Sequence, residues 1–150
     1  MVTKKRTRSG MIRSSKSPVD RLDLYAIGLD SLNANLERYN YASAHSEDAK
    51  SVKRRIKSTY KVSDYSKEHL DITGTLNLEV EAKGYDKPIL SLVVVLTGHF
   101  HPKNGVTRKE AEDFAEAEAT LVFWPYFRQI VSDTTARMHI GAITLPLAVG

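Results

Sequence analysis

Four polar residues in the middle of the chain have the types and spacing of a metal site. His99 and His101 are two apart in an expected strand, so both lie on one face of it. If the turn at Gly84-Tyr85-Asp86 closes a tight hairpin, Asp71 lies near His99 and His69 lies near His101. Three imidazoles and one carboxylate would suit zinc. Polar residues at a solvent-exposed sheet end explain the same pattern, and a one-residue slip would scatter the four. We therefore predict no metal and keep zinc as the alternative.

Other chemistry has little support in the sequence. There is no cysteine, which excludes disulfides, thiolate nucleophiles and cysteine-based metal sites. Gly98 and Gly105 are isolated, with no phosphate-loop or dinucleotide spacing around them. An acidic cluster at 110–118 fits a solvated helix face, with a paired-carboxylate site as the alternative. We predict that the protein is not an enzyme and needs no cofactor.

Composition indicates one globular domain with a basic extension. The chain has 150 residues, a formal net charge of +4 and 27% charged residues, and no apolar stretch is long enough for a membrane span. Residues 1–16 carry six basic and no acidic side chains: Lys4, Lys5, Arg6, Arg8, Arg13 and Lys16. We predict a disordered tail at 1–19, a folded domain at 20–150 and a cytoplasmic location. Binding of nucleic acid by the tail is the alternative.

The elements that position these residues begin with strands. The region around Leu22 and Tyr25 fits a helical turn or an early strand, and Leu29 to Leu36 predicts a strand with imperfect alternation. Residues 37–51 are rich in Asn, Ser and Ala and predict a loop. Apolar and polar residues then alternate around Ile56–Val62, through 70–82 and through 88–100. This order predicts an antiparallel meander with one packed face and one largely solvated face.

Helical periodicity follows from Thr107. Thr107 and Glu110 have the spacing of a capping box, and Pro125 is expected to kink or restart the helix. An apolar stripe follows, with Gly141 beyond the helix and an apolar extended end at 143–149. We predict an α+β fold, in which a four-stranded antiparallel sheet precedes a long Pro-kinked helix packed on one face.

Three segments resemble the SecB family of protein-export chaperones. Phe123-Trp124-Pro125-Tyr126-Phe127-Arg128 is similar to the aromatic-Pro-Tyr-x-Arg motif that opens the long helix of that family. Leu145-Pro146-Leu147 resembles the strand that follows the helix, and Gly98-His99-Phe100 resembles the end of the fourth strand. The resemblance covers residues 25–149 and is strongest at 88–147.

The resemblance implies an ATP-independent holdase that binds unfolded preproteins in apolar grooves. The groove candidates are Tyr39, Tyr41, Ile56, Tyr60, Trp124 and Leu147. It also implies a homotetramer, a dimer of dimers whose protomers pair through edge strands and whose dimers stack through the long helices. The interface candidates are Phe123, Tyr126, Phe127, Ile130, Val131, Thr134 and Met138. Ordinary core packing is the competing explanation for at least half of the groove candidates.

The sequence also departs from the family in ways that bear on its partners. Export-dedicated members dock the motor protein SecA on acidic residues of the outer sheet surface. Glu79 and Glu81 are the candidates here, but Val93 stands where an acidic residue is expected. Phe127 and Gln129 replace the small and acidic residues usual beside the arginine, and no counterpart of the C-terminal lid helix follows. A chaperone dedicated to one client, such as an antitoxin, is therefore the alternative. A nucleic-acid or scaffold-binding module using the basic tail is a further one.

Overall fold

The computed structural model describes residues 21–47 and 51–147. Its elements, in chain order, are β1 (Leu22–Leu36), α1 (Arg38–Glu47), β2 (Val52–Tyr65), β3 (Leu70–Ala82), β4 (Leu90–Pro102), α2 (Arg108–Ala117) and α3 (Ala119–Arg137). The predicted basic tail at 1–19 lies outside the described residues. No helix within the described ranges is long and apolar enough to cross a membrane.

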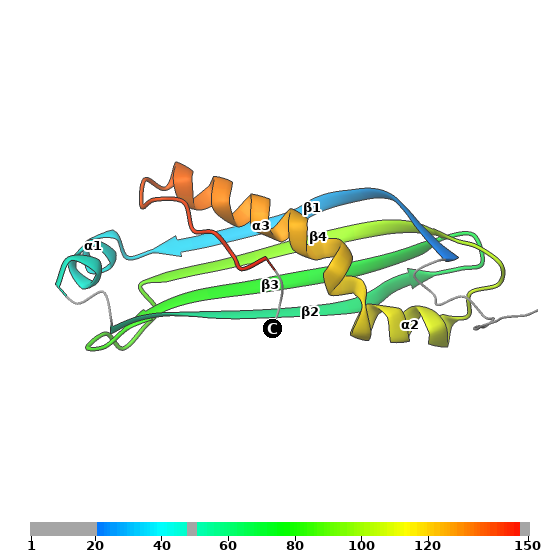
Figure 1. Cartoon of the computed structure of the whole chain (residues 1–150), viewed down its shortest axis with the longest axis horizontal. Helices are drawn as coiled ribbons and strands as arrows, with labels where there is room; N and C mark the ends of the chain where they lie inside the picture. Colours follow the sequence, from blue (N-terminus) through cyan, green and yellow to red (C-terminus); the bar gives the residue numbers. More distant parts are fainter. Residues whose placement is uncertain (1–20, 48–50, 148–150) are drawn as a thin grey trace, which may run out of the picture.

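The four strands form one antiparallel sheet in the order β1-β4-β3-β2. Both helices that follow the sheet in sequence lie on one face of it, which we call the helix face (Figure 1). The α+β prediction is therefore confirmed. In β3 and β4 every second residue from Leu70 and from Leu90 faces the helices, and these side chains are almost fully buried apart from two glycine positions. Strict alternation of buried and half-buried positions is what a sheet with one packed face requires.

The edge strand β1 begins at Leu22, so the region around Leu22 and Tyr25 forms the early strand and not the helical turn. Its register with β4 shifts twice, between Leu24 and Ala26 and between Leu29 and Ser31. Each shift is a bulge or irregularity that inserts a residue and moves later side chains to the other face. This explains why β1 shows imperfect alternation in the sequence.

The segment between β1 and β2 is a correction to the sequence reading. Residues 38–47 form the helix α1, whereas a loop was expected over 37–51. The helix lies at the end of the sheet, where the chain crosses from one edge strand to the other (Figure 1). Tyr41 and Ala44 are its buried residues, three apart and so on one side of the helix. Contact with the rest of the fold therefore offsets a composition poor in apolar residues.

The helical region starts as predicted and breaks elsewhere than predicted. Thr107 and Glu110 form the capping box at the start of α2, since the Thr107 hydroxyl accepts from the Glu110 amide and the Glu110 carboxylate accepts from the Thr107 amide. The break between α2 and α3 falls at Glu118, whose φ and ψ are −127° and −16°. Pro125 lies inside α3, which begins at Ala119, so the helix restarts six residues before the proline.

The helix α3 rests on the sheet where the sheet lacks side chains. The ring of Phe123 is fully buried and packs against Gly74 and Gly98, on the neighbouring strands β3 and β4. From there α3 continues toward the β1 side, and the Met138 carbonyl at its end accepts a hydrogen bond from Arg38, 2.8 Å away. The chain then turns at Gly141, where φ is +85°, and returns along the helix.

Candidate polypeptide-binding surface

The C-terminal segment 142–147 is held against α3 by three hydrogen bonds. The Ile143 amide donates to the Thr135 hydroxyl at 2.7 Å, and the Arg128 Nε donates to the Leu145 carbonyl at 3.0 Å. The Trp124 Nε1 donates to the Pro146 carbonyl at 2.7 Å. Trp124 and Arg128 are four apart and so share one side of α3. The aromatic-Pro-Tyr-x-Arg motif therefore fixes the returning chain.

Burial and packing give structural roles to three groove candidates. Trp124 is 4% exposed and Tyr60 is half-buried, so neither offers a free apolar face to a client. The Tyr60 ring packs edge-on against Phe123, with centroids 5.3 Å apart, and its hydroxyl donates to Thr120 at 3.0 Å. Ile56 lies on the same face of β2 and is also half-buried against the core.

The two α1 tyrosines have opposite environments. Tyr41 is buried and stacks on His45 with ring centroids 4.0 Å apart. Burial raises the pKa of the Tyr41 phenol, and Arg54 opposes that shift. Tyr39 is 83% exposed, as is Leu147 at the end of the C-terminal segment. Of the six groove candidates, Tyr39 and Leu147 thus have the accessible apolar surface that a client would need.

Three interface candidates on α3 are corrected by their burial. Phe123, Phe127 and Val131 are each 0% exposed within a single chain, because they face the sheet. They form the protomer core and have no surface for a partner. Tyr126 is exposed, and Ile130, Thr134 and Met138 are half-buried, so these four remain interface predictions.

Exposed leucines that the sequence analysis did not single out add to the apolar surface. Leu29 and Leu32 in β1 are 51% and 41% exposed. They pair opposite Leu96 and Val94, so their side chains project on the helix face. Leu121 is also exposed, and lies about 200° around α3 from the buried Phe123, on the side away from the sheet. The register shift between Leu29 and Ser31, which the sequence pattern does not reveal, places Leu29 and Leu32 on the same face.

The two sheet edges differ in charge. Within the described residues, neither β1 nor β2 pairs with a further strand on its outer side. The β2 strand carries five basic residues, namely Lys53, Arg54, Arg55, Lys57 and Lys61. The β1 strand contains no Lys or Arg. Because charged side chains, lysine above all, deter strand addition, β1 is the edge open to pairing and β2 is guarded.

The docking candidates Glu79 and Glu81 lie on the outer face of the sheet, opposite the helices. Their ladder partners on β2 are Arg55 and Lys53, and Arg55 also forms an ion pair with Glu81 at 3.0 Å. The acidic row is thus flanked by a basic row. An outer surface of mixed charge is less suited to a basic partner than an acidic one would be.

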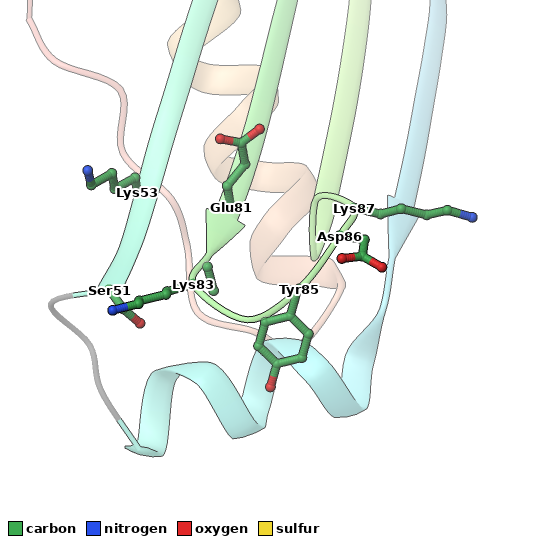
Figure 2. A pocket seen from close by; sticks show the side chains of 8 residues that line it. Ser51, Lys53, Glu81, Lys83, Tyr85, Asp86 and Lys87 are labelled. Carbon is green, nitrogen blue, oxygen red and sulfur yellow. The ribbon is translucent and has the colours of Figure 1, made fainter.

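A hollow of about 450 Å³ lies at the end of the sheet beside α1 (Figure 2). Lys53, Glu81, Lys83, Asp86 and Lys87 contribute to its lining, with Tyr85 pointing toward α1. Figure 2 shows Lys53 and Lys87 directed away from each other. The charged rim and diverging side chains do not form an apolar groove.

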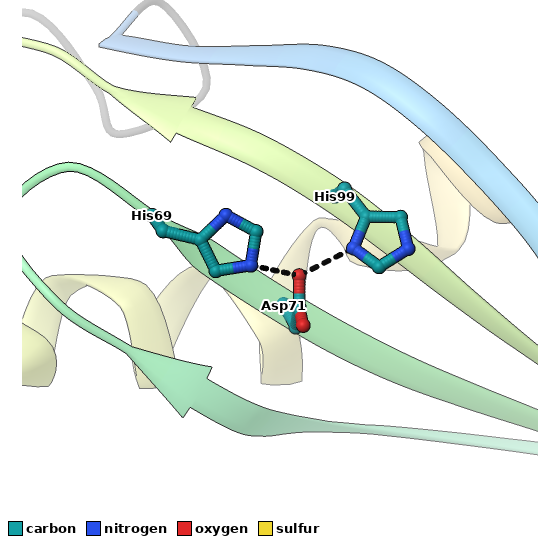
Figure 3. Close-up of side chains that lie close together, drawn as sticks. All are labelled: His69, Asp71 and His99. Carbon is teal, nitrogen blue, oxygen red and sulfur yellow. Dashed lines mark hydrogen bonds and ion pairs between the residues drawn. The ribbon is translucent and has the colours of Figure 1, made fainter.

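The predicted polar cluster is present in part. His69, Asp71 and His99 meet on the outer face, with a nitrogen of each imidazole 2.6 Å from the same Asp71 oxygen (Figure 3). His101 does not join them. Its ring stacks on Tyr25 with centroids 4.1 Å apart, and its Nδ1 lies 3.4 Å from the Glu68 carbonyl oxygen. The hairpin register was predicted correctly for Asp71 opposite His99.

The sequence matches no protein-family model, and no curated protein matches it significantly.

Solved structures do match the fold. The SecB-like chaperone Rv1957 of Mycobacterium tuberculosis, in complex with a ChAD peptide from the HigA1 antitoxin Rv1956, superposes with a TM-score of 0.70 at 16% identity. The match covers 87% of this chain and 93% of that one. A protein of unknown function from Streptococcus agalactiae gives a TM-score of 0.45 at 9% identity, over 84% and 97% of the two chains. The first match, the strand order and the position of α3 together show that this chain has the fold of the SecB-like chaperones.

Proposed function

We propose that the protein is an ATP-independent chaperone that binds an unfolded polypeptide on the helix face. The observation that carries the proposal is the pair of exposed leucines, Leu29 and Leu32, on that face of a SecB-like fold. Tyr39 in α1 and Leu147 at the end of the C-terminal segment are further exposed apolar side chains that a client could contact. Exposed apolar side chains of this size contact the same client residues that drive aggregation.

Two protomers pair through their β1 edges in this proposal. The edge carries no Lys or Arg, and strand pairing occurs in the plane of the sheet. The side chains of Leu29 and Leu32 project perpendicular to that plane, so they stay accessible to a client after pairing. Stacking of two such dimers through α3, with the exposed Tyr126 as a contact, would give the expected tetramer.

A dedicated client is the more specific version of this function. The structural neighbour was solved with a peptide from an antitoxin, and Glu79 and Glu81 of this chain face basic residues. Both points favour an antitoxin client over general export with SecA. Binding of one antitoxin at least about 100-fold tighter than of generic unfolded proteins would support this version. Equal affinities would favour general export.

The test is suppression of aggregation by the purified chain. Mixing the protein with a chemically unfolded client should delay light scattering by the client and give a stable complex. The variant Leu29→Ser/Leu32→Ser should weaken client binding by at least about tenfold, because burying one leucine contributes about 1.5–3 kcal/mol. Leu121→Ser is the matched control, since it removes an exposed leucine that faces away from the sheet.

Solution mass is measured for each variant, so that a loss of assembly is not mistaken for a loss of client binding. A wild-type chain that leaves client aggregation unchanged would overturn the proposal. Equal client affinity of the double variant and the wild type would overturn the assignment of Leu29 and Leu32.

A further inference from the structure

The cluster on the outer face has a donor set suited to a transition metal. Nε2 of His69 and Nδ1 of His99 each lie 2.6 Å from Oδ1 of Asp71, and the three ligand atoms lie within 4.8 Å of one another. The three side chains converge on one point from β3, β4 and the turn before β3 (Figure 3). Two imidazoles with one carboxylate are common ligands of zinc.

The backbone fixes this arrangement. Asp71 and His99 are directly opposite in the β3–β4 ladder, where side chains on one face lie close together. His69 is held by a tight turn, because the Ser66 amide donates to the His69 carbonyl at 2.7 Å. The hydroxyl of Tyr25, from β1, lies 3.3 Å from His69 Nδ1. A partner on the second imidazole nitrogen is the usual support for a metal-bound histidine.

We propose that His69, Asp71 and His99 bind one Zn²⁺, with water as the fourth ligand. The side chains are 32%, 19% and 36% exposed, so an ion can reach them from solvent. Donor atoms around tetrahedral zinc lie roughly 3.3 Å apart for bonds of about 2.0–2.1 Å. The 2.6 Å separations here are those of hydrogen bonds, in which both imidazoles donate to Asp71. Zinc takes the place of those two protons after a small outward movement of the side chains, and each proton moves to the other nitrogen of its imidazole, so that both rings stay neutral.

The site is independent of the polypeptide-binding surface. It lies on the outer face of the sheet, whereas Leu29 and Leu32 project on the helix face. Bound zinc would tie β3, β4 and the turn at 66–69 together. It would also leave one coordination position open toward solvent, as in sites with three protein ligands.

The experiment is a calorimetric zinc titration of the metal-free chain without a polyhistidine tag. One Zn²⁺ per chain is expected, and saturating zinc should raise the melting temperature by about 5–10 °C at 100-fold excess over Kd. His99→Ala and Asp71→Asn should each abolish this shift. Tyr25→Phe keeps the ring that stacks on His101, and should weaken zinc binding about tenfold through loss of the hydroxyl.

His45→Ala and His139→Asn are the controls, since neither side chain belongs to the cluster and Asn tolerates the positive φ of residue 139. Both should bind zinc as the wild type does. Co²⁺ provides a second readout, because four-coordinate cobalt gives intense visible absorption that His99→Ala should remove. A titration without saturable binding, or the same zinc affinity in His99→Ala as in the wild type, would overturn the proposal.

Discussion

At Gly74 the sheet and α3 approach so closely that only hydrogen fits between them. A Cβ atom at this position would lie 2.8 Å from the Phe123 ring and 2.9 Å from the Tyr60 ring. Both rings belong to the packed core and have little room to move. We predict that Gly74→Ala lowers the free energy of unfolding by about 1–3 kcal/mol, measured by denaturant titration at fixed protein concentration.

Gly28→Ala is the matched control, since a Cβ there meets nothing within 4 Å and the backbone has no positive φ. It should be neutral or stabilise by about 0.5 kcal/mol, by restricting the unfolded chain. Equal destabilisation by both substitutions would contradict the close approach at Gly74.

Trp124 provides a second test at the residue scale. Trp124→Phe keeps an aromatic ring and removes the N–H that donates to Pro146. Loss of this bond should cost about 1 kcal/mol and loosen the C-terminal segment, visible as faster amide hydrogen exchange at Ile143 and Leu145. Tyr126→Phe changes an exposed tyrosine two residues away and should leave exchange unchanged. Unaltered exchange in Trp124→Phe would show that the other two hydrogen bonds suffice.

The sequence indicates which residues of α3 matter but not which atoms they contact. The aromatic-Pro-Tyr-x-Arg motif was recognised, but Trp124 and Arg128 bind backbone carbonyls that lie 22 and 17 residues away. Every residue type has a backbone carbonyl, so the sequence does not show which carbonyl a side chain will bind. Phe123 likewise reads as one member of an apolar stripe, although its fit depends on glycines in two strands far from it in the chain.

The start of α2 gives a prediction about pH at the scale of an element. The Thr107 amide, and also the Arg21 guanidinium, hold the pKa of Glu110 below its usual value, while partial desolvation opposes them. A carboxylate with a lowered pKa stabilises the fold above the unfolded-state pKa, near 4.5, and loses that contribution as the pH falls through its folded value. We therefore expect Glu110→Gln to lower the melting temperature at pH 7, and the difference from wild type to shrink below pH 4.5.

Glu112→Gln is the control for Glu110, because Glu112 pairs with Arg108 in the preceding turn of the helix and both side chains are exposed. Exposed pairs contribute little, so its melting temperature should follow the wild type at both pH values. A pH-independent effect of Glu110→Gln would mean that the carboxylate charge is not what stabilises the cap.

Secondary-structure elements were predictable where one face is packed and the other is solvated, because apolar and polar residues then alternate. β3 and β4 alternate along their whole length because one side is packed and the other is not. β1 lacks a clear alternation in the sequence because two bulges shift its register. α1 lacks a clear apolar stripe because Tyr41 and Ala44 are its only buried residues among those described. The helix break is at Glu118 because α2 and α3 pack on different parts of the sheet. The position of Pro125 in the sequence does not predict this break, because the break depends on tertiary packing.

The charge difference between the two sheet edges predicts the assembly of the whole molecule. If β1 pairs with β1 of a second chain and two dimers stack, light scattering should give about 67 kDa, four times 16.8 kDa. Asn33→Lys/Asn35→Lys adds two lysines to exposed positions of β1 and should lower the mass at least twofold. Thr59→Lys adds a lysine to β2, which is already basic, and should leave the mass unchanged.

A wild-type mass of 16.8 kDa would contradict pairing altogether. A normal mass for the β1 variant combined with a lowered mass for Thr59→Lys would place the interface on the other edge.

If the chain is the chaperone that we propose, it binds aggregation-prone polypeptides and must not itself assemble into fibres. A sheet whose two edge strands are both free to pair can add further protomers at each edge without limit, as in open-ended assemblies. Here the row of basic side chains along β2 leaves one competent edge per protomer. Once two such edges meet about a two-fold axis, both are used up and the sheet terminates. In the proposed dimer, the basic residues of β2 would thus limit the size of the assembly although they lie on the edge that contacts no partner.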